Sequence, residues 1–155
     1  MNEIEKSNRR VEMSAVLSDA VYKYEVAYTA GRKNPTEMAV GVLDDAGVDS
    51  SSYKIVDSMY DRGSGVAAIA VEDTMTGETY IAYAGTNMGA DGHKDPIVDL
   101  AIALNDTLYL KEKNKPALDF YDRVEANGHY ISTTTGHSYG VFQSGRVAIE
   151  KQLLS

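Results

Sequence analysis

The sequence predicts an α/β fold in which an antiparallel hairpin opens the sheet, parallel strands follow, and helices cover both faces. From Glu78 onward, strand-like and helix-like segments alternate in the order strand, helices, strand, helix, which is the βαβ order of a parallel sheet wrapped by helices. The chain has 155 residues, of which 43% are hydrophobic and 25% charged, as in an average globular protein. That length fits one domain spanning residues 1–155.

The first predicted element is a long helix that ends at Gly31. Its apolar side chains recur every three or four residues and would form one buried stripe, made of Met13, Leu17, Val21, Tyr24 and Tyr28. A second, short helix is expected to begin at Asn34-Pro35 and to end at Gly47, because Asn caps helices well and Pro suits the first helical turn.

Three strands are predicted next, from Tyr53 to Tyr60, from Val66 to Val71 and from Glu78 to Ala84. The turn-forming residues at 73–77 separate the last two strands, so we expect an antiparallel hairpin there. The acidic pair Glu72-Asp73 is interpreted as solvated charge at this turn.

After the hairpin the pattern changes. A polar loop containing two glycines spans Asn87 to Lys94, and Asp95-Pro96 then caps a helix. Another helix is predicted from about Pro116. A short strand from His129 to Thr135 then leads directly into the last helix.

The charge and composition exclude several classes of function. The formal net charge is −8 and the basic residues are scattered, so the basic stripe that binds phosphates is missing and we expect no nucleic-acid partner. Cysteine is absent, which excludes a thiol nucleophile and a disulfide framework. No apolar run approaches the ~20 residues of a transmembrane helix. Because the N-terminus is charged, we expect a cytoplasmic protein, or one exported without a classical signal peptide.

One motif carries chemistry. Gly136-His137-Ser138-Tyr139-Gly140 matches G-x-S-x-G, the pattern of a sharp strand-to-helix turn that exposes a nucleophilic serine. The glycines are needed because side chains there would collide as strand and helix approach each other. A strand-like segment precedes the motif and a helix-like segment follows it, which favours this interpretation over a glycine-bounded loop with an ordinary serine.

Two segments together resemble the class 3 lipases and their bacterial relatives in the α/β-hydrolase superfamily. The first is Tyr80 to Asn87 (YIAYAGTN), followed by Asp99-Leu100, and the second is Thr133 to Gly140 (TTTGHSYG). The resemblance covers most of the chain, although Val141 stands where the family often has a further glycine. It implies the N-terminal portion of an α/β-hydrolase sheet, and a lipase or esterase that needs no cofactor and hydrolyses a lipid or a small acyl ester.

The resemblance also implies site residues. Ser138 would be the nucleophile, and the backbone N–H groups of Tyr139 and Thr86 would donate to the oxyanion. The loop from Asn87 to Lys94 would be either a lid over the site or a plain surface loop.

The rest of a catalytic triad is missing from the expected place. The fold orders its triad as Ser, then Asp or Glu, then His, yet residues 139–155 contain neither His nor Asp. His137 is expected to pack beneath the turn, and His129 lies at the far end of the strand. His93, in the loop between two aspartates, is the candidate base. The spacing around His93 matches no known ligand pattern, so no metal site is predicted.

Three interpretations stay open from the sequence. The chain is a serine ester hydrolase whose base comes from His93 or from a partner. Alternatively, it is a non-catalytic hydrolase-like fragment that binds a protein partner or associates with itself, because a shortened sheet would expose a strand edge and an apolar helix face. In the third, the motif is chance in an unrelated α+β module.

Overall fold

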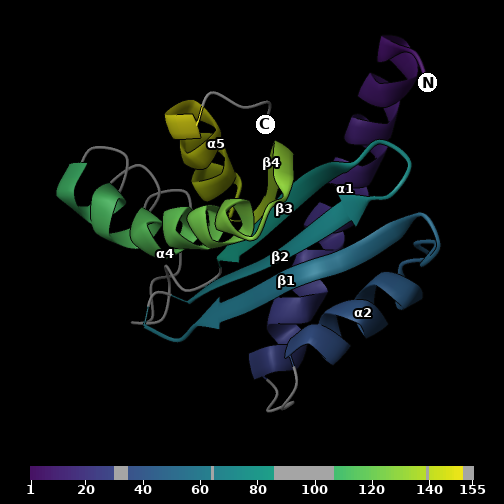
Figure 1. Cartoon of the computed structure of the whole chain (residues 1–155). Coiled ribbons are helices and arrows are strands. Elements are labelled where there is room, and N and C mark those ends of the chain that lie inside the picture. The colour runs from purple at the N-terminus through teal and green to yellow at the C-terminus, as the bar shows by residue number, and fades with distance from the viewer. Residues whose placement is uncertain (30–34, 64, 86–106, 139, 152–155) are drawn as a thin grey trace.

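The computed structural model describes residues 1–29, 35–63, 65–85, 107–138 and 140–151. It contains helices on either side of a sheet (Figure 1). In chain order the elements are α1 (Glu3–Thr29), α2 (Pro35–Asp45), β1 (Tyr53–Asp61), β2 (Val66–Asp73), β3 (Glu78–Gly85), α4 (Thr107–Ala126), β4 (Tyr130–Ser138) and α5 (Gly140–Lys151).

The sheet is mixed, as predicted. Its strand order is β1-β2-β3-β4; β2 is antiparallel to both β1 and β3, whereas β3 and β4 are parallel. A tight turn with Gly77 at a φ of 76° joins β2 to β3, which is the hairpin that the turn residues predict.

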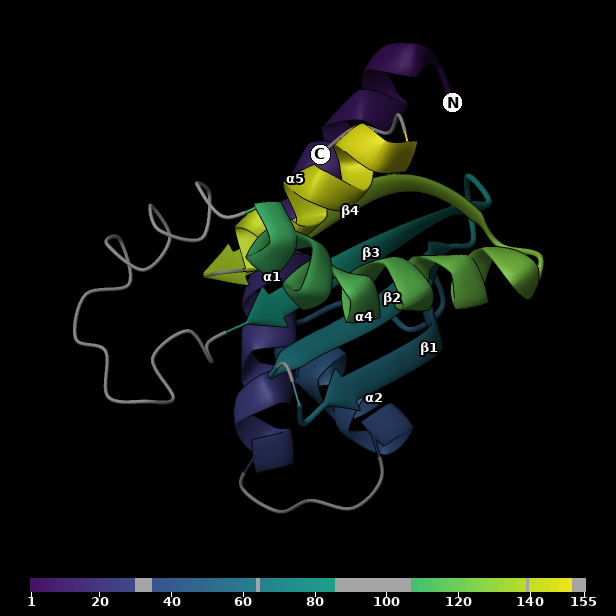
Figure 2. The ribbon, with the colours of Figure 1, turned by 90° about the vertical axis from the view of Figure 1, so that its left-hand side faces the viewer.

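Helices cover both faces of the sheet, which is also as predicted (Figures 1 and 2). On one face α1 and α2 pack against side chains such as Ile69, Tyr80 and Ala82. On the other face Ala117, Phe120 and Val124 of α4, together with Val147 of α5, pack against the alternate residues of the same strands. The two inner strands are therefore buried on both sides. This burial explains why the sequence of β2 is a continuous run of apolar residues.

The outer strand β4 is less exposed than a shortened sheet suggests. It has a neighbouring strand on one side only among the described elements, yet Ile131, Ser132, Thr133 and Thr134 are each at most 8% exposed. Both α1 and α5 pack closely on this strand, so the helices shield it (Figure 2). The expectation of an open strand edge is therefore wrong for this part of β4.

The helix predicted from Pro116 begins earlier, at Thr107, and Pro116 lies inside α4. A proline removes one helical hydrogen bond, and tertiary packing can outweigh that loss. Here the residues just after it, Ala117, Phe120 and Tyr121, are buried against the sheet and hold the helix in place.

Asp73 also differs from its predicted role as a solvated turn charge. Its side chain is fully buried and accepts two hydrogen bonds from Arg9, Nε to Oδ2 and Nη2 to Oδ1, each 2.9 Å long. This bidentate pair raises the pKa of the Arg9 guanidinium, chiefly through the hydrogen bond itself. One helical position further on, Arg10 pairs with Glu78, so α1 is clamped to both ends of the β2–β3 turn.

Candidate functional site

The candidate site lies where the two parallel strands end. In the register of β3 and β4, Ala84 is opposite His137 and Gly85 is opposite Ser138. The carboxyl ends of both strands therefore stop side by side. In open α/β sheets this edge is the usual place for ligands, because helices begin there and loops leave room for a substrate.

The chain changes from strand to helix within the G-x-S-x-G motif. Ser138 is the last residue of β4, and α5 begins at Gly140 with a single residue between them. The strand runs three residues beyond its predicted end at Thr135, because Gly136, His137 and Ser138 continue the pairing with β3. The predicted order of strand, serine and helix is thus present in the backbone.

Hydrogen bonds from two helices fix the strand just before Ser138. On one face, the Ser18 hydroxyl donates to the Gly136 carbonyl, and the Thr135 hydroxyl donates to the Ser14 carbonyl over 3.2 Å. On the other face, the Thr134 hydroxyl donates to the carbonyl of Ser144 in α5 over 2.8 Å. The threonine-rich strand therefore uses its hydroxyls to tie the turn to helices on both sides.

A bulge in β4 sets which threonine faces which helix. Thr79 pairs with Ile131 but Tyr80 pairs with Thr133, so Ser132 is an extra residue in the strand. The extra residue shifts the alternation of side chains, so that Ile131 and Thr134 both face the α4 and α5 side.

The strand beside the site is buried and is hydrogen-bonded to a helix. Tyr83, opposite Gly136, is fully buried, and its hydroxyl donates a 2.9 Å hydrogen bond to the Ala117 carbonyl. Burial raises the pKa of Tyr83 far above its usual range, so the phenol stays neutral. Tyr83 therefore ties β3 to the main chain of α4.

Several predicted site residues lie outside the described residues. These are Thr86, Tyr139 and His93, with the loop around His93. Gly85, the residue before Thr86, is the register partner of Ser138. The two segments that the oxyanion assignment needs thus end next to each other, whereas the assignment of Thr86 and Tyr139 stays a prediction.

The structure excludes one of the three histidines as the base for Ser138. His129 precedes β4, and its Nδ1 lies 3.6 Å from a carboxylate oxygen of Glu72. It lies nine positions before Ser138 along the strand, or about 30 Å, so His129 cannot be the base. His137 is placed only as a strand residue opposite Ala84, and His93 is not among the described residues.

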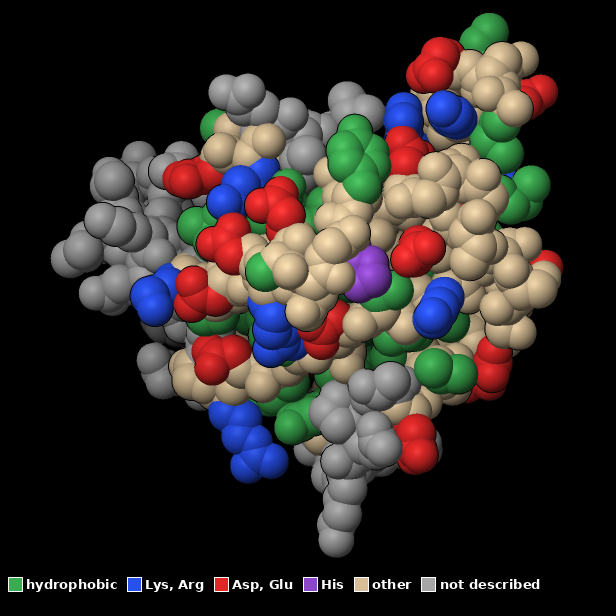
Figure 3. Space-filling view, in the orientation of Figure 1, with side chains coloured by type: hydrophobic (Ala, Val, Ile, Leu, Met, Phe, Trp, Pro, Cys, Tyr) green, Lys and Arg blue, Asp and Glu red, His purple; other side chains and the backbone are tan. Residues whose placement is uncertain are grey.

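In the described part of the chain, no three His, Asp or Glu side chains lie together as a metal site, and no helix is long and apolar enough to span a membrane. Positive and negative side chains are intermixed on the face shown in Figure 3, so no basic stripe is visible there.

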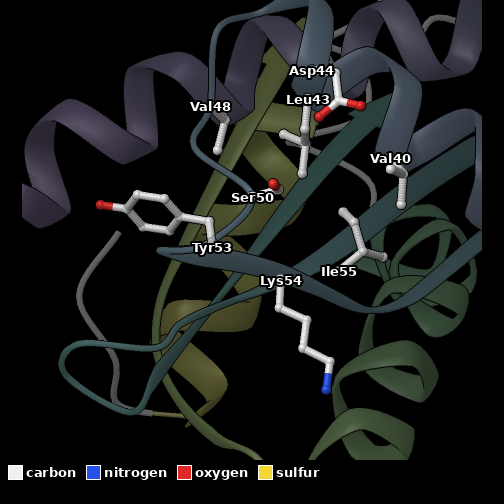
Figure 4. Close-up of a pocket in the computed structure, with 8 residues that line it drawn as sticks. All are labelled: Val40, Leu43, Asp44, Val48, Ser50, Tyr53, Lys54 and Ile55. Atoms are coloured by element: carbon white, nitrogen blue, oxygen red, sulfur yellow. The ribbon is translucent and has the colours of Figure 1, made fainter.

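A small hollow lies away from this site. It measures about 180 Å³ and is formed by α2 and β1, where Val40 and Leu43 point toward Ile55 (Figure 4). β1 and β4 are separated by two strands, or about 14 Å at the usual strand spacing. The hollow is therefore not part of the candidate site, and Lys54 at its rim points away from the apolar walls (Figure 4).

Helix α1 contributes to the site through contacts that its sequence pattern does not predict. Ser14 and Ser18 lie one helical turn apart, and both bond to residues just before Ser138. Ser18 uses its hydroxyl, whereas Ser14 uses its main-chain carbonyl, so only Ser18 could have been noticed in the sequence, as a weak helix former within a long helix.

No family model and no curated protein matches the sequence. Among solved structures, lipase II from Rhizopus niveus is similar, with a TM-score of 0.43 and 14% sequence identity. The similarity covers 93% of this chain and 56% of the lipase chain, so this chain spans a little over half of that lipase's length.

Proposed function

We propose that this chain is a serine ester hydrolase of the lipase or esterase type, with Ser138 as the nucleophile. The observation that carries the proposal is the position of Ser138 within G-x-S-x-G, as the last residue of β4 and two residues before α5. A serine between a strand and a helix, at the carboxyl end of a parallel strand pair, is the backbone arrangement that this chemistry requires.

The reaction is acyl transfer through the serine. The Ser138 hydroxyl adds to the carbonyl carbon of an ester, and the alcohol leaves with a proton returned by the base, which forms an acyl-serine. Water then adds to the acyl-serine, releases the carboxylic acid and restores the serine. The N-terminus of α5 favours the negative charge that develops on the carbonyl oxygen, and Thr86 and Tyr139 are the proposed N–H donors.

The mechanism also requires a general base for Ser138. A serine hydroxyl needs a base within hydrogen-bond reach, and His129 is about 30 Å away along the strand. His93 is therefore the candidate within this chain, and a histidine supplied by a partner is the alternative source.

A second candidate function follows from the same observation. If no base reaches Ser138, the chain is a non-catalytic relative that keeps the turn and acts by binding a protein. The remoteness of His129 favours this alternative, and the order of strand, serine and helix favours catalysis.

A fluorophosphonate probe separates the two, because it forms a covalent bond only with an activated serine. We expect intact-mass analysis to show one probe on the wild-type chain, none on Ser138→Ala, and one on the matched control Ser7→Ala, which changes an exposed serine of α1. Failure to label the folded wild-type chain contradicts catalysis and leaves the binding function.

A further inference from the structure

Three carboxylates are buried in the described part of the chain: Glu25, Asp73 and Glu78, which are 3%, 0% and 6% exposed. Asp73 and Glu78 form the two arginine pairs at the β2–β3 turn. Glu78 is opposite the first residue of β4, so this turn lies at the end of the sheet away from Ser138. Glu25 is in the second half of α1 and belongs to neither arginine pair.

Helix α1 carries Glu25 across the sheet near the carboxyl ends of the parallel strands (Figure 2). At β4, the Ser18 hydroxyl donates to the Gly136 carbonyl. Ten residues later in α1, the ring of Tyr28 stacks on Tyr60 of β1, with 4.6 Å between the ring centres. Ten helical residues span about 15 Å, and β1 and β4 are about 14 Å apart, so α1 crosses from β4 to β1 over this stretch.

The crossing follows one row of paired residues. From Tyr60 the register runs across all four strands to His137, the residue before Ser138. Burial raises the pKa of Tyr60, and the negative charge of Glu25 raises it further. The positive charge of Arg62 acts on Tyr60 in the opposite direction, but Arg62 is exposed. Glu25 is therefore a buried negative charge beside the row that leads to Ser138.

Glu25 shares a side of α1 with Ser18. The two are seven residues apart, which places them within about 20° of each other around the helix and about 10.5 Å apart along it. The Cα–Cβ bond of a helical residue tilts toward the start of its helix, so the Glu25 side chain leaves the backbone in the direction of Ser18. Both contacts of α1 with β4 follow the same order along helix and strand, so Glu25 and Ser138 both lie beyond the Ser18 contact.

This separation suits a histidine between the two side chains. An imidazole that bonds to a carboxylate on one side and to a hydroxyl on the other joins oxygens roughly 7–8 Å apart, because each hydrogen bond adds about 3 Å. Glu25 is not without a partner. A carboxylate accepts about four hydrogen bonds, so an existing contact leaves room for a histidine N–H.

The acidic side chain that follows Ser138 in the sequence is less suitable. Glu150 is the one Asp or Glu among residues 139–155, and it is exposed. It lies ten residues after the first residue of α5, or about 15 Å along that helix. An acid from the first helix of the chain thus fits the site better than one from the last.

We propose that Glu25 is a positioning residue for the reaction at Ser138, and that its carboxylate accepts a hydrogen bond from the histidine that serves as the base. This inference rests on the proposed function. The carboxylate holds the ring with its other nitrogen toward the Ser138 hydroxyl and stabilises the imidazolium that forms when the ring takes the serine proton. The proton then passes to the leaving alcohol, and Glu25 stays ionised throughout.

Glu25→Gln in the full chain tests the inference, because it keeps the shape of the side chain and removes its charge. We expect kcat for p-nitrophenyl butyrate, and the rate of fluorophosphonate labelling, to fall at least about hundredfold with little change in KM, because an amide does not hold the productive tautomer. Glu12→Gln is the matched control, since Glu12 is an exposed glutamate of the same helix, and it should match the wild type.

The pH profile separates positioning from a purely structural role. A nearby carboxylate stabilises the imidazolium and raises the pKa of the base. We therefore expect Glu25→Gln to shift the rising limb of the labelling rate to lower pH by about one unit or more. Glu25→Asp keeps the charge but shortens the side chain, so its rate should lie between those of the wild type and Glu25→Gln, with the wild-type pH profile.

The outcomes distinguish the inference from the proposed function. If the wild type is labelled at Ser138 and Glu25→Gln reacts at the wild-type rate, or more slowly with an unshifted pH profile, the inference is overturned and the proposed function stands. If Glu25→Gln does not unfold cooperatively in urea, Glu25→Asp decides, and a full wild-type rate in that variant overturns the inference. A folded wild-type chain that takes up no probe overturns both.

Discussion

The Ser18 hydroxyl donates a hydrogen bond to the Gly136 carbonyl and so joins two residues that are 118 positions apart. Gly136 is two residues before Ser138, in the last part of β4 that pairs with β3. The strand before the candidate nucleophile is thus held by a helix from the opposite end of the chain.

Ser18 should therefore act as a positioning residue for Ser138. We expect Ser18→Ala to lower kcat for an ester, and the rate of fluorophosphonate labelling, about fivefold, because a hydrogen bond contributes about 1 kcal/mol. KM should change little, and Ser18→Thr should restore much of the rate since it keeps the hydroxyl. The control is Ser7→Ala, on the same helix but exposed. Labelling by Ser18→Ala at the wild-type rate contradicts the positioning role.

His93 should matter if the chain is catalytic. Without a base, a serine hydrolase keeps only a residual ~10³–10⁴-fold acceleration over water. We expect His93→Ala to reduce the initial rate of p-nitrophenyl butyrate hydrolysis by a factor comparable to that of Ser138→Ala.

The histidine beside Glu72 supplies the control for that experiment. His129→Ala should leave the rate unchanged, because His129 lies at the opposite end of β4. If the Ser138 and His93 variants match a low wild-type rate, the chain is non-catalytic. Robust hydrolysis by Ser138→Ala contradicts the nucleophile assignment itself.

Much of the fold could be predicted from the sequence because its signals are local. The turn residues between β2 and β3, the continuous apolar run of β2 and the spacing of Leu17, Val21 and Tyr24 in α1 each fix an element by their own periodicity. The strand-to-helix change at Ser138 was predicted for the same reason, since the glycines mark it.

The predictions that the structure corrects all concern contacts between segments that are distant in the sequence. Asp73 looks like a turn residue, and only its pairing with Arg9, 64 positions earlier, buries it. Likewise, α4 continues past Pro116 because the residues that follow it pack against the sheet. The burial of β4 depends in the same way on its packing against α1 and α5. Periodicity within a segment contains no information on such pairs.

The Arg9–Asp73 pair should be important for stability. Asp73→Asn removes the charge, leaving Arg9 without its partner, and breaking a largely buried pair costs about 3 kcal/mol. We expect the free energy of unfolding in urea to fall by about this amount with an unchanged m-value. Asp45→Asn, an exposed aspartate of α2, should change it by less than about 0.5 kcal/mol. A loss as small as that of the control shows that the pair contributes no net stability.

Buried tyrosines should make the fold sensitive to alkali. Burial raises the pKa of Tyr24 to about 12 and, together with the nearby charge of Glu125, that of Tyr121 to about 12. In the unfolded chain both phenols ionise near pH 10. Between these values the unfolded state binds fewer protons than the folded state, so the free energy of unfolding must fall as pH rises from about 10 to about 12.

A phenylalanine variant isolates one of these hydroxyls. Tyr24→Phe keeps the ring and removes the ionisable group, so its stability measured by urea unfolding should decline less steeply between pH 10 and 12 than that of the wild type. Tyr22→Phe is the matched control, because Tyr22 is two residues away on α1 and 37% exposed. We expect this control to keep the wild-type slope. If both variants decline with the same slope as the wild type, the Tyr24 hydroxyl is not the group that couples folding to alkaline pH.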